Sequence, residues 1–385
     1  MDFELSEEHL ALRESARALI AQRWDRDKSR LALDRPPARM PDSLWKEIAS
    51  LGWIGVAGTE ELGGSGGDLM AALVLAEEAG RGLLPGPFLP ALAAGIALDR
   101  SAADDQRAEL LGHLFAGDRV LVGAYDEPGG TWGPGSLHTT VTPTHTGLVV
   151  DGVKILVPDA DRASAFVLSG RAGDSTVLAV VPSEATGVEV IPMNRFDGQS
   201  MAEVRFASVE VKGSTLIGPG RTPGGGQPAD DAYDISTLVC AADLLGVSEA
   251  ALAMATGYAK DRVQFGHPIG SYQAISHRLA DLVVDTELGR SLLFGACLAM
   301  AEARDEAPRL VSAAKAWMSD TAIGATETAL HVHGGIGFTW ELDVHLYLRR
   351  ARSGAASFGD ANFHRDRIAT LLAARDPSRS GPELT

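Results

Sequence analysis

The sequence is poor in cysteine, with only Cys240 and Cys297 among its 385 residues. Both lie in segments with helical character, so no disulfide framework is expected, and the cytoplasm is the expected location. No uninterrupted apolar run reaches the roughly 18 residues that cross a bilayer, which predicts a chain without a membrane segment. The acidic start, Met1 to Glu8, lacks the basic region of a signal or transit peptide.

Basic residues are also scarce, because 34 Lys and Arg stand against 51 Asp and Glu and give a formal net charge of −17. Such a charge argues against nucleic acid or an anionic membrane as a partner, but a local arginine cluster can still bind an anionic small ligand. A metal site is not expected either. His331 and His333 diverge on a predicted helix end, and no cysteine or carboxylate cluster joins them.

What is present is an ordinary globular composition, with 45% apolar and 22% charged residues. A chain of this length can bury a sizeable core and is expected to form two or three domains. The pattern of apolar positions divides it into a helical part at 1–118, a strand-rich part at 119–217, a linker at 218–228 and a second helical part at 229–385.

The first helical part contains several predicted helix starts. Ser6 is placed to cap one helix, and Asp42 or Ser43 begins another. Asp68 caps a third helix over 69–80. The glycine-rich stretch 61–67 before that helix has a composition that can cradle phosphate. However, it follows no predicted strand and lacks the Lys-Ser/Thr ending of a phosphate-binding loop, so it is interpreted as a tight connection.

The middle part is a series of short, β-branched segments at 120–122, 147–150, 165–168, 176–181, 187–191 and 202–206. Turn residues separate them. Strands this closely spaced, with no helix between them, predict an antiparallel barrel or sandwich and not a parallel sheet alternating with helices. The glycine- and proline-rich linker that follows is predicted to be flexible.

The second helical part is organised around residues 261–277. Proline-free helical patterns run before this stretch, over about 231–260, and after it, over about 273–303. Gly266 and Pro268 break the chain between them. Later helices are predicted over 307–332 and 362–374.

The break presents side chains that suit one kind of ligand. Arg262, Gln264 and Phe265 lie at the end of the first helix, and Gln273 opens the next. A fork-shaped cation, an aromatic plane and amide donors at one turn suit a ligand that carries phosphate and a flat ring. An ordinary helical hairpin with a capping arginine fits the same residues, and composition alone leaves both interpretations open.

Several motifs, in their order along the chain, resemble the acyl-CoA dehydrogenase family. They are Met1-Asp-Phe3, Glu60-Glu-Leu-Gly-Gly64, Glu127-Pro128, Asp151-Gly-Val-Lys154, Arg262 to His277, and His331-Val-His-Gly-Gly-Ile-Gly-Phe-Thr339. The resemblance covers nearly the whole chain, and the last two motifs are the most specific.

The resemblance implies an α+β, acyl-CoA dehydrogenase-like fold, with an N-terminal helical domain, a central antiparallel β-barrel or sandwich, and a C-terminal four-helix bundle. It also implies a tetramer built on those bundles, FAD lying between subunits, acyl-CoA as substrate and an electron-transfer flavoprotein as acceptor. In this family a carboxylate removes the substrate α proton while hydride leaves the β carbon for the flavin.

The same resemblance implies which residues bind a neighbouring subunit's FAD. Arg262 would pair with the pyrophosphate, Phe265 would contact the adenosine side, and Gln273 would donate hydrogen bonds. His331 stands where the family usually has glutamine, and two glycines after it would allow close backbone approach to the cofactor. The implied cofactor-binding residues are Arg262, Gln264, Phe265, Gln273, His331, Gly334 and Gly335.

The chain departs from the family where it would build its own active site. The usual catalytic glutamate falls on Phe358, and the alternative glutamate of other members falls on Ser236. Phenylalanine cannot accept the proton, and serine cannot without an activating partner. Leu156-Val-Pro158 stands where a flavin-contacting Trp-Ile-Thr is usual, and proline offers neither a hydroxyl nor an N–H. Asp126-Glu-Pro128 replaces the usual Thr-Glu-Pro.

Residues that would serve a neighbour's FAD are thus kept, while those of the chain's own site are replaced. This pattern resembles actinobacterial members in which two paralogous subunits form an α2β2 heterotetramer. Several of those act on CoA thioesters of steroid side chains. The chain is therefore predicted to be the non-catalytic subunit of an FAD-dependent acyl-CoA dehydrogenase.

Other interpretations stay open. A self-sufficient homotetramer would need a different base, and Asp360 lies two residues from the expected position. Asp234, two residues before the alternative base position on a helix, is predicted to point away. A non-redox acyl-CoA-binding or scaffold protein leaves the residues at the helix break unexplained. Arg349 and Arg350 are interpreted as salt-bridge formers, with a CoA or interface role as the alternative.

Overall fold

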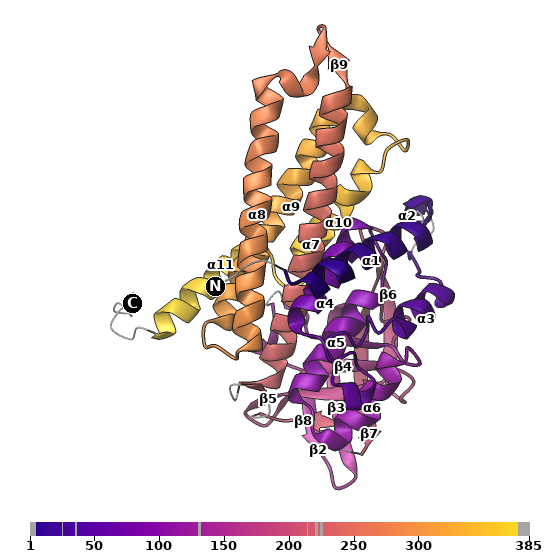
Figure 1. Ribbon diagram of the computed structural model, residues 1–385. Helices are drawn as coiled ribbons and strands as arrows, with labels where there is room; N and C mark the ends of the chain where they lie inside the picture. Colours follow the sequence, from indigo (N-terminus) through magenta and orange to yellow (C-terminus); the bar gives the residue numbers. More distant parts are fainter. Residues whose placement is uncertain are drawn as a thin grey trace.

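The computed structural model describes residues 5–375 except 25, 35–36, 130–131, 214, 220–221 and 224–225. Helices come first, strands follow, and helices complete the described chain. In Figure 1 the strands and the N-terminal helices form one end of the molecule, and long C-terminal helices rise from them to a narrow tip. The predicted fold class is confirmed.

The N-terminal helices are α1 (Glu7–Arg23), α2 (Arg26–Asp34), α3 (Asp42–Ser50), α4 (Leu69–Arg81), α5 (Phe88–Ser101) and α6 (Asp104–Phe115). The C-terminal helices are α7 (Pro228–Asp261), α8 (Gln273–Ala301), α9 (Ala307–His333), α10 (Val344–Ala356) and α11 (Ala361–Arg375), with short turns η4 (Ile269–Ser271) and η5 (Gly334–Phe338). As predicted, the Ser6 and Asp68 side chains cap α1 and α4, and α3 begins at Asp42.

The strands are β1 (Leu121–Ala124), β2 (Thr140–Pro143), β3 (Gly147–Pro158), β4 (Ala165–Ala172), β5 (Ser175–Pro182), β6 (Val188–Asn194), β7 (Ser200–Lys212), β8 (Leu216–Ile217), β9 (Val263–Gln264) and β10 (His267–Pro268). Among the described residues the first eight form one sheet, in the order β6-β7-β3-β2-β4-β5-β8 with β1 also paired to β4. Strands β1 and β2 run parallel to β4, and the remaining pairs of this sheet are antiparallel. The sheet is therefore mixed, which corrects the prediction of a wholly antiparallel β part. Parallel neighbours need a long connection, which β2 and β3 provide between β1 and β4.

Helix α7 is the axis of the molecule. It packs against α4 and α5 of the N-terminal part, against β5, and against α8, α9 and α10 of the bundle. Nearly every residue from Ala232 to Ala251 is buried. By length and hydropathy alone α7 could cross a membrane, but 72% of its most apolar 18-residue window is buried inside the fold, as in the core helix of a globular protein.

Helices α4 and α7 cross with their backbones in contact at two glycines. A Cβ added to Gly246 on α7 would lie 1.8 Å from the Glu77 carbonyl oxygen, and one added to Gly80 on α4 would lie 2.0 Å from the Asp243 carbonyl oxygen. Real Cβ atoms essentially never come closer than 3.0 Å to such neighbours. The two helices can therefore approach this closely only because both crossing positions are glycine.

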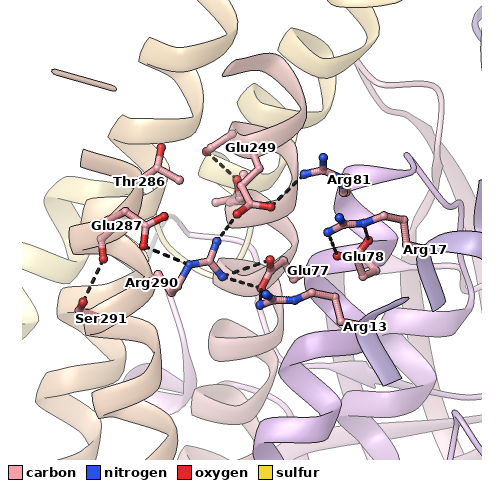
Figure 2. Close-up of polar contacts among 12 residues, drawn as sticks. Arg13, Arg17, Glu77, Glu78, Arg81, Glu249, Thr286, Glu287, Arg290 and Ser291 are labelled. Atoms are coloured by element: carbon pink, nitrogen blue, oxygen red, sulfur yellow. Dashed lines mark hydrogen bonds and ion pairs between the residues drawn. The ribbon is translucent and has the colours of Figure 1, made fainter. Parts of the chain in front are cut away.

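A cluster of charged side chains surrounds this crossing (Figure 2). The Glu77 carboxylate is 2% exposed and accepts hydrogen bonds from Arg290 Nη1 at 3.0 Å and from Arg13 Nη2 at 3.3 Å. Arg290 of α8 also pairs with Glu249 of α7, and Arg81 of α4 contacts Glu249 on its other side. The cluster thus joins α1, α4, α7 and α8 through a buried carboxylate that lies between two arginines.

Replacing Gly246 with alanine is expected to destabilise the protein strongly. The new Cβ would overlap a backbone oxygen of α4, which cannot move without shifting the whole helix. We expect a loss of about 3 kcal/mol or more in the free energy of unfolding, visible as a lower thermal midpoint by circular dichroism. Gly257→Ala is the matched control on the same helix, because Gly257 has open space around it and should gain about 0.5–1 kcal/mol. Equal effects of the two substitutions would contradict a backbone contact at the crossing.

Candidate active site

A cavity of about 80 Å³ lies where the N-terminal helices, the sheet and the bundle meet. Pockets that hold drug-sized ligands enclose roughly 300–1,000 Å³, so this space admits only a compact group. Its wall combines elements from all three parts of the chain, including Leu89 and Ala93 of α5, Pro158 of β3, Val239 of α7 and Gly354 of α10.

The two positions that the family resemblance gives to the catalytic glutamate meet in this cavity. Phe358, from the turn after α10, and Ser236, from α7, both line it. Neither carries a carboxylate, and the Ser236 hydroxyl donates to the Ala232 carbonyl oxygen at 2.9 Å. The structure therefore brings both positions together around one space, and neither of them supplies a base there.

Three aromatic rings pack edge to face beside these positions. Tyr233 lies between Tyr125 and Phe358, with ring centroids 6.2 and 6.1 Å apart and interplanar angles of 78° and 76°. Tyr125 and Tyr233 are almost fully buried, and burial raises the pKa of Tyr125 to about 12. Because edge-to-face contacts add to the gain from burial, Phe358 ties its turn to α7 by packing, and Tyr233 in turn packs on Tyr125 just after β1.

The backbone of the Phe358 turn is held by two buried side chains. Lys315 of α9 donates to the carbonyl oxygens of Ala355 and Gly359 at 3.1 and 2.9 Å. His364 Nε2 donates to the Phe358 carbonyl oxygen at 2.8 Å, and burial lowers the pKa of His364 to about 3, so this ring is neutral. Phe358 itself has a φ of +54°, a strained conformation that persists when surrounding contacts fix it.

Strand β3 is irregular where the family usually carries Trp-Ile-Thr. Leu156 has a φ of +56°, and pairing with β7 shifts register between Lys154 and Val157, which marks a β-bulge. Pro158 ends the strand and lines the cavity. These side chains offer a flavin ring neither an indole to pack on nor a hydrogen-bond donor.

A buried ion pair joins two of the sequence motifs, one in the loop after β1 and one on strand β3 itself. Lys154 Nζ donates to Glu127 Oε1 at 2.7 Å, and burial lowers the pKa of Lys154 to about 8 although the Glu127 charge opposes that change. Burial acts to raise the pKa of Glu127, but Lys154 and backbone donors lower it overall. Burial also raises the pKa of Asp126, the residue before Glu127, to about 6. The pair fixes the Asp126–Pro128 loop to the sheet.

The alternative carboxylates lie outside the cavity wall. Asp360 is exposed, accepts a hydrogen bond from Phe363 N at 2.8 Å at the start of α11, and lines a separate surface hollow between α9, α10 and α11. Asp234 is buried and forms a two-pronged ion pair with Arg367 of α11. Asp234 does not line the cavity, which agrees with the prediction that its side chain points away from the base position at Ser236.

The predicted cofactor-binding turn forms the tip of the α7–α8 hairpin (Figure 1). Arg262 follows α7, Gln273 begins α8, and the short β9–β10 pair lies between them. Arg262, Gln264 and Gln273 are exposed, and Phe265 is 92% exposed with a φ of +52°. The structure thus presents these four side chains together on a surface that the described chain does not cover.

The second predicted group lies at the same end of the bundle. His331 is in the last turn of α9, Gly334 and Gly335 begin η5, and all three are exposed. Tyr258, near the end of α7, stacks on His333 with ring centroids 4.4 Å apart and so joins the two groups. A Cβ added to either glycine would meet no described atom within 4 Å. This open space suits a ligand or another chain that approaches the backbone.

One end of the cavity is polar, and no sequence motif marks it. Arg350, 6% exposed, forms a two-pronged ion pair with Asp243 at 2.8 and 2.9 Å, which confirms a salt bridge for this arginine. Arg349 instead lies over the Phe196 ring, 4.7 Å from its centroid. Asp159, just after β3 and 3% exposed, lines the same end. In the sequence, the adjacent pair Arg349 and Arg350 was the only signal for this group of charged residues.

Comparisons with known proteins agree with this architecture. The family profiles "Acyl-CoA dehydrogenase, N-terminal domain" and "Acyl-CoA dehydrogenase, C-terminal domain" match residues 6–118 and 229–373. The chain is therefore a member of the acyl-CoA dehydrogenase family of FAD-dependent oxidoreductases, as its motifs predicted.

One related sequence and two solved structures show which members of the family this chain is similar to. Acyl-CoA dehydrogenase IpdE2 of Mycobacterium tuberculosis is 30% identical, over 91% of this chain and 92% of the relative. A variant of the steroid ACAD Tcur3481-Tcur3483 has a similar structure, with a TM-score of 0.87, 29% identity and coverage of 96% of this chain and 98% of that one. The ChsE4-ChsE5 complex from Mycobacterium tuberculosis also has a TM-score of 0.87, with 27% identity and 97% and 99% coverage.

The stability of the fold is expected to depend on pH through Asp159. Burial raises the pKa of this carboxyl to about 7, the charge of Asp161 adds to the shift, and Arg195 and Arg350 oppose it. The pKa of an unfolded aspartate is about 3.9, so the folded state holds the proton more tightly. Its contribution to stability is therefore complete below about pH 4 and is lost as pH rises through about 7.

Asp159→Asn keeps the side-chain shape and removes this titration. Between pH 5 and 7 the free energy of unfolding of the parent should fall relative to that of the variant, by up to about 1.4 kcal/mol per pH unit. Denaturant unfolding at a series of pH values measures the difference. Asp105→Asn, at an exposed position of α6, is the control and should give a curve parallel to the parent. A parallel curve for Asp159→Asn would contradict the raised pKa.

Proposed function

We propose that this chain is the subunit of an FAD-dependent acyl-CoA dehydrogenase that lacks the catalytic glutamate and completes the FAD site of a partner subunit. The observation that carries the proposal is that Phe358 and Ser236, which occupy the two base positions and line one cavity, carry no carboxylate themselves. Removing a proton next to a thioester needs a base within hydrogen-bond reach of that proton. This cavity has no base at either position.

The residues around the cavity do not fit a flavin ring belonging to this chain. Leu156 and Pro158 replace the side chains that usually contact the ring, and the edge-to-face packing of Tyr125, Tyr233 and Phe358 fills space beside them. The remaining volume of about 80 Å³ is too small for a three-ring system unless these side chains move. No step of the reaction is assigned to this cavity.

The tip of the hairpin does fit part of a dinucleotide. The Arg262 guanidinium can form two parallel hydrogen bonds with a pyrophosphate, Phe265 offers an exposed ring to an adenine, and Gln273 can donate amide hydrogen bonds. Gly334 and Gly335 leave the backbone of η5 accessible. FAD held there by a partner would supply the hydride acceptor of the reaction, and the residues named here would hold its adenine half.

The distance between tip and cavity supports a role in a partner's site. Arg262 lies 26 residues after Ser236, both on or next to α7. At 1.5 Å per residue this separation is about 39 Å along the helix. A dinucleotide bound at the tip therefore cannot also place its ring in the cavity of the same chain, so the tip side chains are available to another subunit.

An apolar stripe on α8 supports an assembly through the bundle. Val283, Val284 and Leu288 are 48%, 57% and 47% exposed, and Trp317 of α9 is 37% exposed. Contiguous exposed apolar side chains on a helix are typical of a surface that another chain covers. We infer that this stripe contacts another subunit of the tetramer.

The relatives suggest the partner and the substrate class. ChsE4-ChsE5 and Tcur3481-Tcur3483 are each named as a pair of components, and the second is a steroid enzyme. We infer an α2β2 heterotetramer of this chain with a paralogous acyl-CoA dehydrogenase subunit that carries the base. Its substrate class would be acyl-CoA, in particular CoA thioesters of steroid side chains, with an electron-transfer flavoprotein as acceptor and the cytoplasm as location.

Arg262→Ala is expected to lower the FAD content of the purified complex at least several-fold while this subunit stays folded. The reason is the loss of a charge-assisted pair to the pyrophosphate at an exposed position that packs against little. Flavin absorbance per mole of complex gives the occupancy, and circular dichroism gives the folding. Arg304→Ala, in the loop at the opposite end of α8, is the matched control and should leave FAD content unchanged. Unchanged occupancy in Arg262→Ala would count against the proposal.

Asp360→Asn separates the proposal from a self-sufficient homotetramer. Asparagine caps helices about as well as aspartate, so the start of α11 should be preserved. We expect acyl-CoA-dependent dye reduction by the complex to stay within about twofold, because Asp360 does not line the cavity. Loss of a general base, by contrast, costs on the order of 10²–10⁴-fold. A loss of that size, or FAD-bound activity of this chain purified alone, would establish the homotetramer instead.

A further inference from the structure

The polar end of the cavity has more hydrogen-bonding capacity than the described residues use. Arg350 donates to Asp243 through Nε and Nη2, but its Nη1 is buried and has no partner among the described residues. The Asp159 carboxylate is 3% exposed, lines the cavity, and receives no hydrogen bond from a described side chain or backbone group. Buried polar groups are nearly always hydrogen-bonded, so two such groups beside a cavity indicate an occupant.

The fold holds the Asp159 carboxylate at the cavity wall. A Cβ added to Gly86, in the connection between α4 and α5, would lie 1.7 Å from Asp159 Oδ2. Only glycine therefore allows the carboxylate to sit in this place. Asp159 itself has a φ of +49°, which is uncommon for a residue with a side chain. Close packing and an unusual backbone conformation together direct this side chain to one position.

The charges at this end decide which occupant fits. Arg350 is neutralised by Asp243, and Arg195 is neutralised by Asp197 at 3.0 Å. Asp159 is left without a cation of its own, so a carboxylate ligand would meet it unfavourably. An ammonium group has donors but no acceptor, so it would leave Arg350 Nη1 without a hydrogen bond. A neutral group that both accepts from an N–H and donates to a carboxylate is complementary, and a hydroxyl has both capacities.

The cavity is small, and the rest of its lining is mixed. Apolar side chains come from Leu84, Leu89, Pro90, Ala93 and Val239, and polar ones from Gln199, Ser236 and Ser357. One water needs about 10–15 Å³ of such volume, so about 80 Å³ accommodates roughly five to eight atoms other than hydrogen. The occupant therefore has a short apolar body and one polar end.

We propose that the polar end of this cavity binds the hydroxyl group of a compact, otherwise apolar ligand, with Arg350 Nη1 donating to the hydroxyl oxygen and Asp159 accepting the hydroxyl proton. The hydroxyl is carried either by a free small alcohol or by the end of a larger acyl group. This site is independent of the proposed subunit role, because it needs neither FAD nor turnover.

Saturation-transfer NMR titration of the full-length chain with three probes of similar size tests the site, at about pH 8.5, where Asp159 with its pKa of about 7 is ionised and can accept the hydroxyl proton. Pentan-1-ol carries a hydroxyl, 1-methoxybutane has an oxygen that accepts but cannot donate, and pentanoate carries a negative charge. We expect pentan-1-ol to bind at least tenfold more tightly than either of the others. Comparable dissociation constants for the alcohol and the ether would overturn the proposal, since they would show that no group accepts the hydroxyl proton.

Two variants locate the binding. Asp159→Leu should weaken pentan-1-ol at least tenfold and leave 1-methoxybutane unchanged, while Arg349→Lys, which alters an arginine packed on Phe196 outside the cavity, should change neither. If Asp159→Leu does not fold, the comparison of alcohol with ether in the parent chain still tests whether a group in the cavity accepts the hydroxyl proton. A second, smaller space of about 20 Å³ also borders Arg350 and has room for roughly one water. If a water there satisfies Arg350 Nη1, the ether oxygen gains no hydrogen bond and 1-methoxybutane will bind no more tightly than pentane, which would overturn the role of Arg350.

The acyl form of the ligand is distinguished by a matched pair of thioesters. A CoA thioester with a terminal hydroxyl on a five-carbon acyl chain should bind more tightly than its unsubstituted counterpart if the hydroxyl reaches the cavity on an acyl group. Equal binding of the two thioesters, together with selective binding of pentan-1-ol, assigns the site to a free alcohol. Loss of FAD-dependent activity has no bearing on either result, so failure here leaves the subunit role intact.

Discussion

The contact between the backbones of α4 and α7 is the constraint on which the rest of the structure depends. At Gly80 and Gly246 neither helix has room for a single additional carbon. The N-terminal helices are therefore fixed against α7 in both separation and rotation. Around this point Glu77 brings Arg13 and Arg290 together, so that helices from distant parts of the chain share one buried carboxylate. Removing a charge from such a place is costly, because the partner is left unpaired in a poorly solvated site.

The crossing with α4 divides α7 into a half that borders the cavity and a half that extends toward the exposed turn. The first half of the helix is surrounded by α5, the sheet and α10, which together enclose the cavity with Ser236 and Phe358 in its wall. The second half extends with the bundle to the exposed turn at Arg262 and Phe265. One rigid helix therefore separates a closed internal space from an outward-facing surface. A chain that contributes side chains to a partner's site needs such a separation, since those side chains must lie outside its own internal space.

Local chemistry explains what could be predicted from the sequence. Capping by Ser6 and Asp68 needs no distant partner, and these helix ends were confirmed. Helix α5 was not specified in advance, because it is buried on nearly all sides and so lacks the polar face that produces a periodic pattern. The parallel pairing of β1 with β4 depends on tertiary register. In the cavity, motif positions pointed to Phe358 and Ser236, but the ion pair of Asp243 and Arg350 joins residues 107 positions apart, and neither belongs to a local motif.

The turn that carries Phe358 has a consequence for how such proteins diversify. Lys315 and His364 hold the turn through carbonyl oxygens of the main chain, which every amino acid possesses. These contacts hold the backbone of the turn whatever side chain stands at its apex, and the packing of Phe358 on Tyr233 adds to them. After gene duplication, one copy can exchange an acidic side chain for an aromatic one there without forfeiting its architecture. Specialisation of one copy as a scaffold then needs few compensating substitutions, and the pair becomes mutually dependent once the other copy alone retains the chemistry.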